Sequence, residues 1–255
     1  MLDPGKLMSE KRYARTQEDH QDIPEIKFWQ AFSIYGIIQF AVSFFFIKFA
    51  FYGVYYWLPS YLKESLFYTT TEAGNIMSMS AVGGIVGSIL MGLTSDLLVV
   101  KSPVHTASSL IGASMLLCVM FVHTNTHTAL LTMYMSFFFL FENGATIVIA
   151  IVIADIGKNE LLKNKRRAVS TLSGINDGIA GFGSILGQLL LGPIDNIYGW
   201  SGVLSMFTGA ALVACLPTIP YVCKEIKLYL RFREKERKKM FESTDPWTEY
   251  TENND

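Results

Sequence analysis

The chain has 255 residues, of which 51% are hydrophobic and 17% charged, and its formal net charge is -1. A soluble domain has about a quarter of its residues charged, and the mean hydropathy of this chain is +0.32. The composition therefore excludes an ordinary soluble domain and predicts a membrane protein. It gives no reason to expect a nucleic-acid partner.

The chain opens with a polar segment that carries charges of both signs. The stretch MLDPGKLMSEKRYARTQEDHQDIPEIK has neither the apolar run nor the small-residue cleavage site of a signal peptide. We expect residues 1–28 to be a cytosolic arm that precedes the membrane part.

Six apolar runs follow, and each is long enough for a helix that crosses the bilayer, which needs about 20 residues. They lie at 31–61, 73–93, 106–124, 129–156, 168–193 and 201–223. Before the second run, TTTEAGN predicts a helix start capped by Thr70 or Thr71, with Glu72 in the first turn. The sequence thus predicts an all-α membrane protein with a six-helix transmembrane bundle over 29–225.

Lysine and arginine gather on one side of these runs, and cytosolic loops carry the excess of such residues. They occur in the arm, at Lys101, in the stretch 158–167 and in CKEIKLYLRFREKERKKM, whereas the opposite side has only Lys63. Both termini are therefore expected in the cytosol. The tail, 226–255, is expected to be a basic solvated helix followed by a polar segment, in preference to a site for anionic lipid.

Two runs contain small residues at four-residue spacing. The second run has Gly83 with Gly87 and Ser88 with Gly92, and the fifth has pairs of glycines at 174 and 178 and at 183 and 187. Such faces let helix backbones approach closely. Because the two runs are three apart in order, they also indicate, weakly, a three-plus-three internal repeat of the kind found in transporters.

Ionisable residues inside apolar runs require a reason, because a charge at mid-helix costs about 2.5 to 3.5 kcal/mol on insertion scales. Lys48 lies near the middle of the first run, with Tyr52 and Tyr55 at i+4 and i+7 on the same helical face. An ammonium and two phenols on one stripe suit an anion, above all a phosphate. The alternative is a buried Lys48 paired with Glu142 or Asp177.

Glu142 lies deep in the fourth run, and Asn143 and Gly144 follow it. We expect Glu142 to contact a substrate or to serve as counter-charge for Lys48, in preference to carrying a proton. Asp155 is expected at the cytosolic interface. Asp177 is expected to join a hydrogen-bond network rather than to contact a substrate.

The remaining chemistry-bearing residues predict neither an enzyme nor a metal or cofactor site. None of the motifs GxSxG, HExxH or a phosphate-binding P-loop occurs. The three cysteines have no metal-ligand spacing: Cys118, Cys215 and Cys223. The four histidines are expected in loops or at the ends of runs: His20, His105, His123 and His127.

Several stretches together resemble one family. In chain order they are KFAFYGVYYWLPSYL, TEAGNIMSMSAVGGIVGSILMGLTSDLL, ENGATIVIAIVIADIG, LSGINDGIAGFGSILGQLLLGPI and the GW at Gly199 and Trp200. They resemble the carboxyl-terminal half of the sugar-phosphate exchangers of the major facilitator superfamily, from about Trp29 to Glu225. The resemblance implies one six-helix half of a twelve-helix transporter.

The same resemblance implies roles for individual residues. Lys48 stands where the family has a basic residue that binds the substrate phosphate, on the seventh helix of the full transporter. Glu142, on the tenth helix, is implied to face the same central cavity, with Asn143 beside it. Gly92 and Asp96 in GLTSD match a cytoplasmic loop motif that latches helices, but leucines follow Asp96, and Lys101 is the nearest basic residue.

The resemblance implies antiport of a sugar phosphate, such as glucose-6-phosphate, against inorganic phosphate by alternating access. This chain is expected to supply only the C-terminal half, to need an N-terminal six-helix half, and to lie in the endoplasmic reticulum or another endomembrane. We expect a piece of a longer transporter in preference to a half-transporter that pairs with another chain. Two alternatives stay open: a proton-coupled carrier that uses Glu142, and a non-transporting membrane protein.

Overall fold

A computed structural model of the chain describes residues 26–121, 127–158 and 168–244, and all regular structure in these ranges is helical. The predicted arm lies almost entirely outside these ranges, as do His123, most of the basic stretch after the fourth run, and the end of the tail. The elements are α2 (Phe28–Ala31), α3 (Ile37–Glu64), α4 (Thr70–Leu97), α5 (Ser102–Val119), α6 (Thr128–Gly157), α7 (Ala168–Ala214), η1 (Leu216–Thr218) and α8 (Ile219–Thr244).

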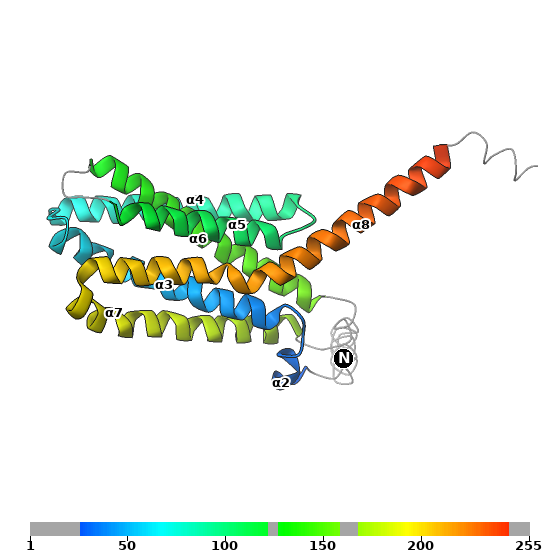
Figure 1. Cartoon of the computed structure of the whole chain (residues 1–255), viewed down its shortest axis with the longest axis horizontal. Coiled ribbons are helices and arrows are strands. Elements are labelled where there is room, and N and C mark those ends of the chain that lie inside the picture. Colours follow the sequence, from blue (N-terminus) through cyan, green and yellow to red (C-terminus); the bar gives the residue numbers. More distant parts are fainter. Residues whose placement is uncertain (1–25, 122–126, 159–167, 245–255) are drawn as a thin grey trace, which may run out of the picture.

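Five helical segments in the described ranges are long and apolar enough to cross a membrane, and the last of them, Ala168–Arg237, has 70 residues, enough for two crossings. The helix α7 breaks at Gly199, whose backbone has φ 63° and ψ -170°, values that favour glycine. Figure 1 shows that the chain reverses direction there and returns along the bundle into α8. The expected six-helix bundle is therefore confirmed.

Two helix starts differ from the prediction. The first span begins at Ile37 rather than near 31, because Gly36, with φ 102°, interrupts the helical path after α2. The cap of α4 is Thr69 rather than Thr70 or Thr71. Its backbone N–H donates to Glu72 Oε2 at 2.8 Å, and its hydroxyl accepts from the Glu72 N–H at 3.3 Å, which makes a capping box.

Glycines bring two pairs of helices into backbone contact, as the sequence predicts. Gly83 and Gly87 of α4 lie directly against the backbone carbonyls of Ser136 and Leu140 on α6, where a Cβ atom would collide with the oxygen. The other pair makes the same contact: Gly183 and Gly187 of α7 lie against the carbonyls of Phe45 and Phe49 on α3. Both helix pairs run parallel, and each joins one of the first three spans to one of the last three, which is the pairing that a three-plus-three repeat predicts.

Gly174 and Gly178 do not follow this prediction. No atom of another residue lies within 4 Å of the position that a Cβ would take at either glycine, and both residues are exposed. The expectation of a helix contact there is wrong, because the α7 face that bears these glycines points away from α3.

The end of the bundle at which α3 begins and α4 ends is called here the Lys101 end. From this end α8 continues beyond the bundle (Figure 1). Its described side chains from Ile226 to Arg237 are exposed apart from the half-buried Tyr229. The structure thus shows the helical tail that the sequence predicts.

Candidate functional site

Lys48 lies on α3, and its ammonium is surrounded by aromatic rings. The Nζ atom is 5.0 Å from the ring centroid of Phe44, 5.0 Å from that of Tyr52 and 5.7 Å from that of Phe51. Cation–π attraction of this kind stabilises the charge without neutralising it. Within the described ranges Lys48 has no ion pair and no hydrogen bond, and the residue is half-buried. The Lys48 charge is therefore held in place and remains free to meet an anion.

The two tyrosines that the sequence places beside Lys48 lie on the same surface of α3. The ring of Tyr52 stacks on that of Tyr56 at 5.9 Å, and the ring of Tyr55 stacks on that of Phe51 at 6.4 Å. Tyr55 is 38% exposed. Its ring also meets the edge of Phe139 on α6 at 6.0 Å. The stripe of Lys48, Tyr52 and Tyr55 is thus built from aromatic contacts that fix the rings and leave part of the face open.

A side chain of α7 is hydrogen-bonded to α3. Gln188 donates from Nε2 to the backbone carbonyl of Tyr52 at 2.9 Å, and its Oε1 accepts from Trp57 Nε1 at 2.7 Å. These two bonds hold α3 against α7. Sequence reasoning missed Gln188, although a polar side chain in an apolar, glycine-rich run is a signal for an interhelical hydrogen bond.

The structure does not bring Glu142 to Lys48. Glu142 is fully buried and faces α5, where a Cβ at Gly112 would approach its Cγ and Oε1 to 2.9 Å. The Ser109 hydroxyl lies beside it, and neither that hydroxyl nor either oxygen of Glu142 has a hydrogen-bond partner among the described residues. The expected Lys48–Glu142 pair does not form, and this placement does not support a cavity-facing Glu142.

Asn143 points in a different direction from Glu142, because successive residues of an α-helix are about 100° apart. Its Nδ2 donates to the Gly84 carbonyl at 3.0 Å and to Ser88 Oγ at 3.0 Å, both on α4. These bonds join α6 to α4 next to the glycine contact. In this structure Asn143 therefore serves helix packing rather than the Lys48 face.

His105 lies in the first turn of α5, at the end of a span as expected, and it is fully buried. Its Nε2 lies 3.0 Å from Ser43 Oγ on α3, and its Nδ1 lies 3.1 Å from the Ala145 carbonyl on α6. A carbonyl only accepts, so Nδ1 carries the proton in this bond. The signal in the sequence is the spacing of Ser102, His105 and Ser109, which places polar groups on one face of α5.

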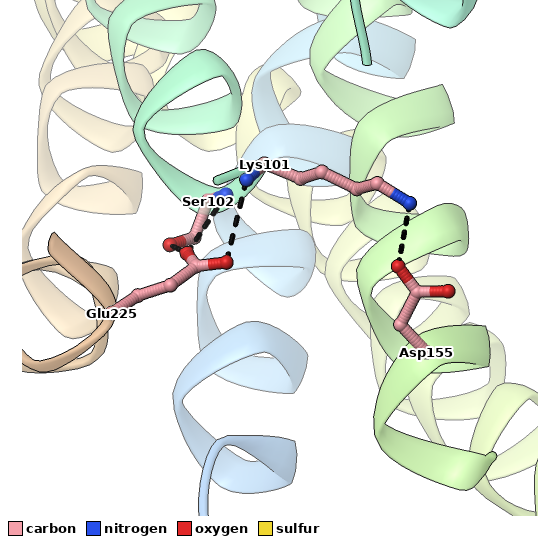
Figure 2. A network of polar contacts seen from close by, with 4 residues as sticks. All are labelled: Lys101, Ser102, Asp155 and Glu225. Atoms are coloured by element: carbon pink, nitrogen blue, oxygen red, sulfur yellow. Dashed lines mark hydrogen bonds and ion pairs between the residues drawn. The ribbon is translucent and has the colours of Figure 1, made fainter. Parts of the chain in front are cut away.

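A polar network joins three helices at the Lys101 end (Figure 2). Lys101 Nζ pairs with Asp155 Oδ2 at 2.6 Å. Glu225 of α8 accepts from the backbone N–H groups of Lys101 at 3.4 Å and of Ser102 at 3.2 Å, and also from the Ser102 hydroxyl. Glu225, which sequence reasoning missed, thus caps the start of α5.

The predicted latch residues, Gly92 and Asp96, do not form the ion pair of Lys101. Asp96 is exposed, and the ion pair of Lys101 is made with Asp155 instead. Gly92 packs against Ile147 of α6, whose Cγ2 atom would lie 4.0 Å from a Cβ at the glycine. The exposed carboxylate of Asp155, which the sequence places at the interface, is therefore the acidic partner of Lys101.

The amino-acid sequence of the chain is similar to those of several known proteins. No family model matches the chain. The chain is 32% identical over 214 residues to the glucose-6-phosphate exchanger SLC37A2 of Mus musculus, a match that covers 84% of this chain and 42% of the relative. It is 29% identical over 230 residues to sugar phosphate exchanger 3 of Xenopus laevis, covering 89% of this chain and 45% of that relative.

A plant protein is also similar to the chain. The identity to the putative glycerol-3-phosphate transporter 1 of Arabidopsis thaliana is 32% over 212 residues, or 79% of this chain and 39% of that protein. The chain thus spans less than half the length of each of these relatives. The chain is thus similar, over less than half of their length, to proteins named as sugar phosphate exchangers and as a glycerol-3-phosphate transporter.

Proposed function

We propose that the chain supplies the C-terminal half of a transporter that exchanges a sugar phosphate for inorganic phosphate. The observation that carries the proposal is Lys48, a half-buried cation in a membrane span that has no ion pair among the described residues. The names of the relatives, which refer to glucose-6-phosphate, sugar phosphate and glycerol-3-phosphate, supply the substrate class. All of these substrates carry a phosphate whose oxygens accept hydrogen bonds from an ammonium and from phenols.

In this proposal the phosphate binds at Lys48, and Tyr52 and Tyr55 line the rest of the site. A second basic residue, from an N-terminal half, completes the phosphate clamp. Glu142 and Asn143, which the sequence also offers as site residues, are assigned to helix packing because of their contacts with α5 and α4. Rocking of the two halves then exposes the site to one side of the membrane at a time.

The charged face itself supports the need for a second half. Lys48 on α3 and Asp177 on α7 both lie within membrane spans, and neither is fully buried by this bundle. Charged groups at this depth normally face a protein interior or a water-filled cavity, because hydrocarbon solvates them poorly. An N-terminal six-helix bundle placed over this face would provide such a cavity.

The distribution of basic residues supports an orientation with the Lys101 end in the cytosol. In that orientation both termini are cytosolic. We also propose that the membrane is the endoplasmic reticulum or another endomembrane. The Lys101–Asp155 pair and the Glu225 cap then form the cytosolic closure of this half.

The test uses a fusion in which the amino-terminal half of the Mus musculus relative precedes this chain, reconstituted into vesicles loaded with labelled phosphate. We expect Lys48→Ala to lower phosphate exchange about 100-fold, which corresponds to the loss of about 3 kcal/mol of charge-assisted bonding. Lys63→Ala, at the exposed end of the same helix, is the matched control and should leave exchange unchanged. Equal exchange by the Lys48→Ala variant and the unmodified fusion would contradict the site assignment.

The buried carboxyl of Glu142 bears on a second candidate, a proton-coupled carrier. Its oxygens have no hydrogen-bond partner among the described residues, so they are open to a proton. However, Glu142 is fully buried against α5 and does not lie with Lys48, so a proton taken up there has no described route to the substrate. The geometry therefore supports phosphate exchange over proton coupling.

A further inference from the structure

The start of α8 lies beside an exposed aromatic cluster at the Lys101 end. Phe28 and Trp29 of α2 are 52% and 79% exposed. Tyr35, in the linker after α2, stacks its ring on that of Tyr221 at 5.6 Å, and its hydroxyl donates to the Pro220 carbonyl at 3.5 Å. Tryptophan and tyrosine are enriched where a membrane meets water. These contacts therefore place the first turn of α8 at the edge of the membrane.

Beyond that turn, basic side chains follow one face of α8. Lys224, Lys227, Arg231 and Lys235 are spaced by three, four and four residues, which places them on one helical face, called here the basic stripe. All four are exposed, and within the described ranges none of them forms an ion pair. The Nζ atom of Lys224 lies 3.9 Å from the ring centroid of Tyr35. The basic stripe thus begins at the aromatic cluster.

The acidic residues nearby do not neutralise the start of the basic stripe. Glu225 is turned toward α5, where it accepts from the Ser102 N–H at 3.2 Å. Neither Lys224 nor Lys227 has an acidic residue three or four positions away, the spacing at which side chains of a helix meet. Glu234 borders only the far end of the stripe. The positive charge is therefore greatest close to the membrane edge.

Large apolar side chains border the basic stripe. Leu228 lies four residues after Lys224, and it is 57% exposed. Phe232 lies three residues before Lys235, and it is 59% exposed. Helices that bind a membrane surface combine basic side chains, which are drawn to anionic lipids, with apolar side chains that enter the boundary between headgroups and acyl chains. This face of α8 offers both.

The first part of the basic stripe is within reach of the lipid headgroups. An α-helix rises about 1.5 Å per residue, so Arg231 lies about 10 Å beyond Lys224 along the helix. The headgroup layer on each side of a bilayer is about 5 to 7 Å thick. Figure 1 shows that α8 leaves the bundle at a slant to the other helices, which keeps its first turns near that layer. Long lysine and arginine side chains extend back toward it.

We propose that the basic stripe binds the phosphate groups of anionic phospholipids in the leaflet at the Lys101 end. Lipid is favoured over an acidic protein segment because the stripe begins at the membrane edge, where headgroups already surround it. This reverses the sequence-based preference for a helix that is only solvated, since the sequence does not show that the stripe starts beside the aromatic cluster. The proposal is independent of the proposed function.

The test titrates the full chain in detergent micelles with phosphatidylserine or phosphatidylcholine and counts the bound lipids by native mass spectrometry. We expect the unmodified chain to bind phosphatidylserine more tightly than phosphatidylcholine. Arg231→Gln should reduce this preference about fivefold, because one basic residue at an anionic surface contributes about that factor. Arg233→Gln is the matched control, two residues further along α8 on another face, and should leave the preference unchanged.

Further variants sharpen the result. Arg231→Lys keeps the charge and should keep most of the preference, whereas Arg231→Gln combined with Lys227→Gln should lose more than Arg231→Gln alone. Equal losses in Arg231→Gln and Arg233→Gln would show a general effect of charge and contradict the proposal. An unmodified chain without any preference for phosphatidylserine would also contradict it and leave an acidic protein as the partner.

One more variant separates this proposal from the proposed function. Lys48→Ala should bind both lipids as the unmodified chain does, so loss of phosphate exchange and loss of the lipid preference are independent outcomes. Thermal unfolding in the same detergent verifies that each variant is folded.

Discussion

At the scale of single residues, Glu142 and Lys48 are both ionisable side chains within spans, but their surroundings differ. The ammonium of Lys48 is bordered by aromatic rings at an open face. Glu142 is fully buried between α5 and α6, and its oxygens have no hydrogen-bond partner among the described residues. A charge buried in that way without a partner costs several kcal/mol. We therefore expect the stability of the bundle to depend on the shape and polarity of the Glu142 side chain and not on a negative charge there.

The variant Glu142→Gln tests this expectation, because it keeps the shape of the side chain and cannot carry a charge. We expect its thermal unfolding midpoint in detergent to stay within about 3 °C of that of the unmodified chain, since less than about 1 kcal/mol is lost. Glu142→Lys, which forces a charge into the same space, should lower the midpoint far more. Equal losses in the two variants would show that the carboxyl group is needed for a specific interaction.

At the scale of helices, the bundle depends on glycines that face backbone carbonyls. Gly87 of α4 and Gly183 of α7 lie so close to the facing helix that an added methyl group collides with a carbonyl oxygen, which a rotamer change cannot relieve. Gly174 has open space around it. Gly87 and Gly183 thus have no room for a side chain, whereas Gly174 has.

Alanine substitutions separate these two kinds of glycine. Gly87→Ala and Gly183→Ala should each destabilise the bundle by about 1 to 3 kcal/mol, because one helix must move away from the other. Gly174→Ala is the matched control and should stabilise the fold by about 0.5 to 1 kcal/mol through helix propensity. Denaturant unfolding in mixed micelles measures both. A stabilising Gly87→Ala variant would contradict the close packing of α4 on α6.

The polar network at the Lys101 end also belongs to this scale, because it joins α5 to α6 and α8. Asp155 has a side chain that is 48% exposed, and an exposed ion pair contributes about 0 to 1 kcal/mol. Glu225 is half-buried and accepts two backbone N–H groups at the start of α5. We expect Glu225→Ala to cost about 1 to 2 kcal/mol, more than Asp155→Ala. Thermal unfolding at low and high salt checks this, and only the Asp155 effect should fade with salt.

What the sequence predicts well is the geometry within one helix. The stripe of Lys48, Tyr52 and Tyr55 follows from helical spacing alone, and the glycine contacts at Gly83 and Gly183 follow from the same spacing. The burial of Glu142 and the exposure of Asp177 could not be predicted, because they depend on how α6 and α7 are rotated against their neighbours. The cap at Thr69 was missed for a smaller reason: three threonines in a row offer the same chemistry, and only the backbone of Thr69 is extended.

At the scale of the whole molecule, the described chain is a six-helix bundle with a charged face, and it matches less than half the length of its relatives. The surface that bears Lys48 needs a partner, because its charge is not suited to hydrocarbon. The central claim is therefore that this bundle, joined to an N-terminal half, exchanges a phosphorylated sugar for phosphate at the Lys48 face.

The most direct test is trans-stimulated efflux from vesicles that contain this chain fused to the amino-terminal half of the Mus musculus relative. Vesicles are loaded with labelled phosphate, and efflux is followed with and without external glucose-6-phosphate, and with and without a proton gradient. We predict that external glucose-6-phosphate accelerates efflux, that collapsing the proton gradient has little effect, and that neither half alone supports the exchange. Efflux that ignores external glucose-6-phosphate and stops when the proton gradient is collapsed would contradict the account.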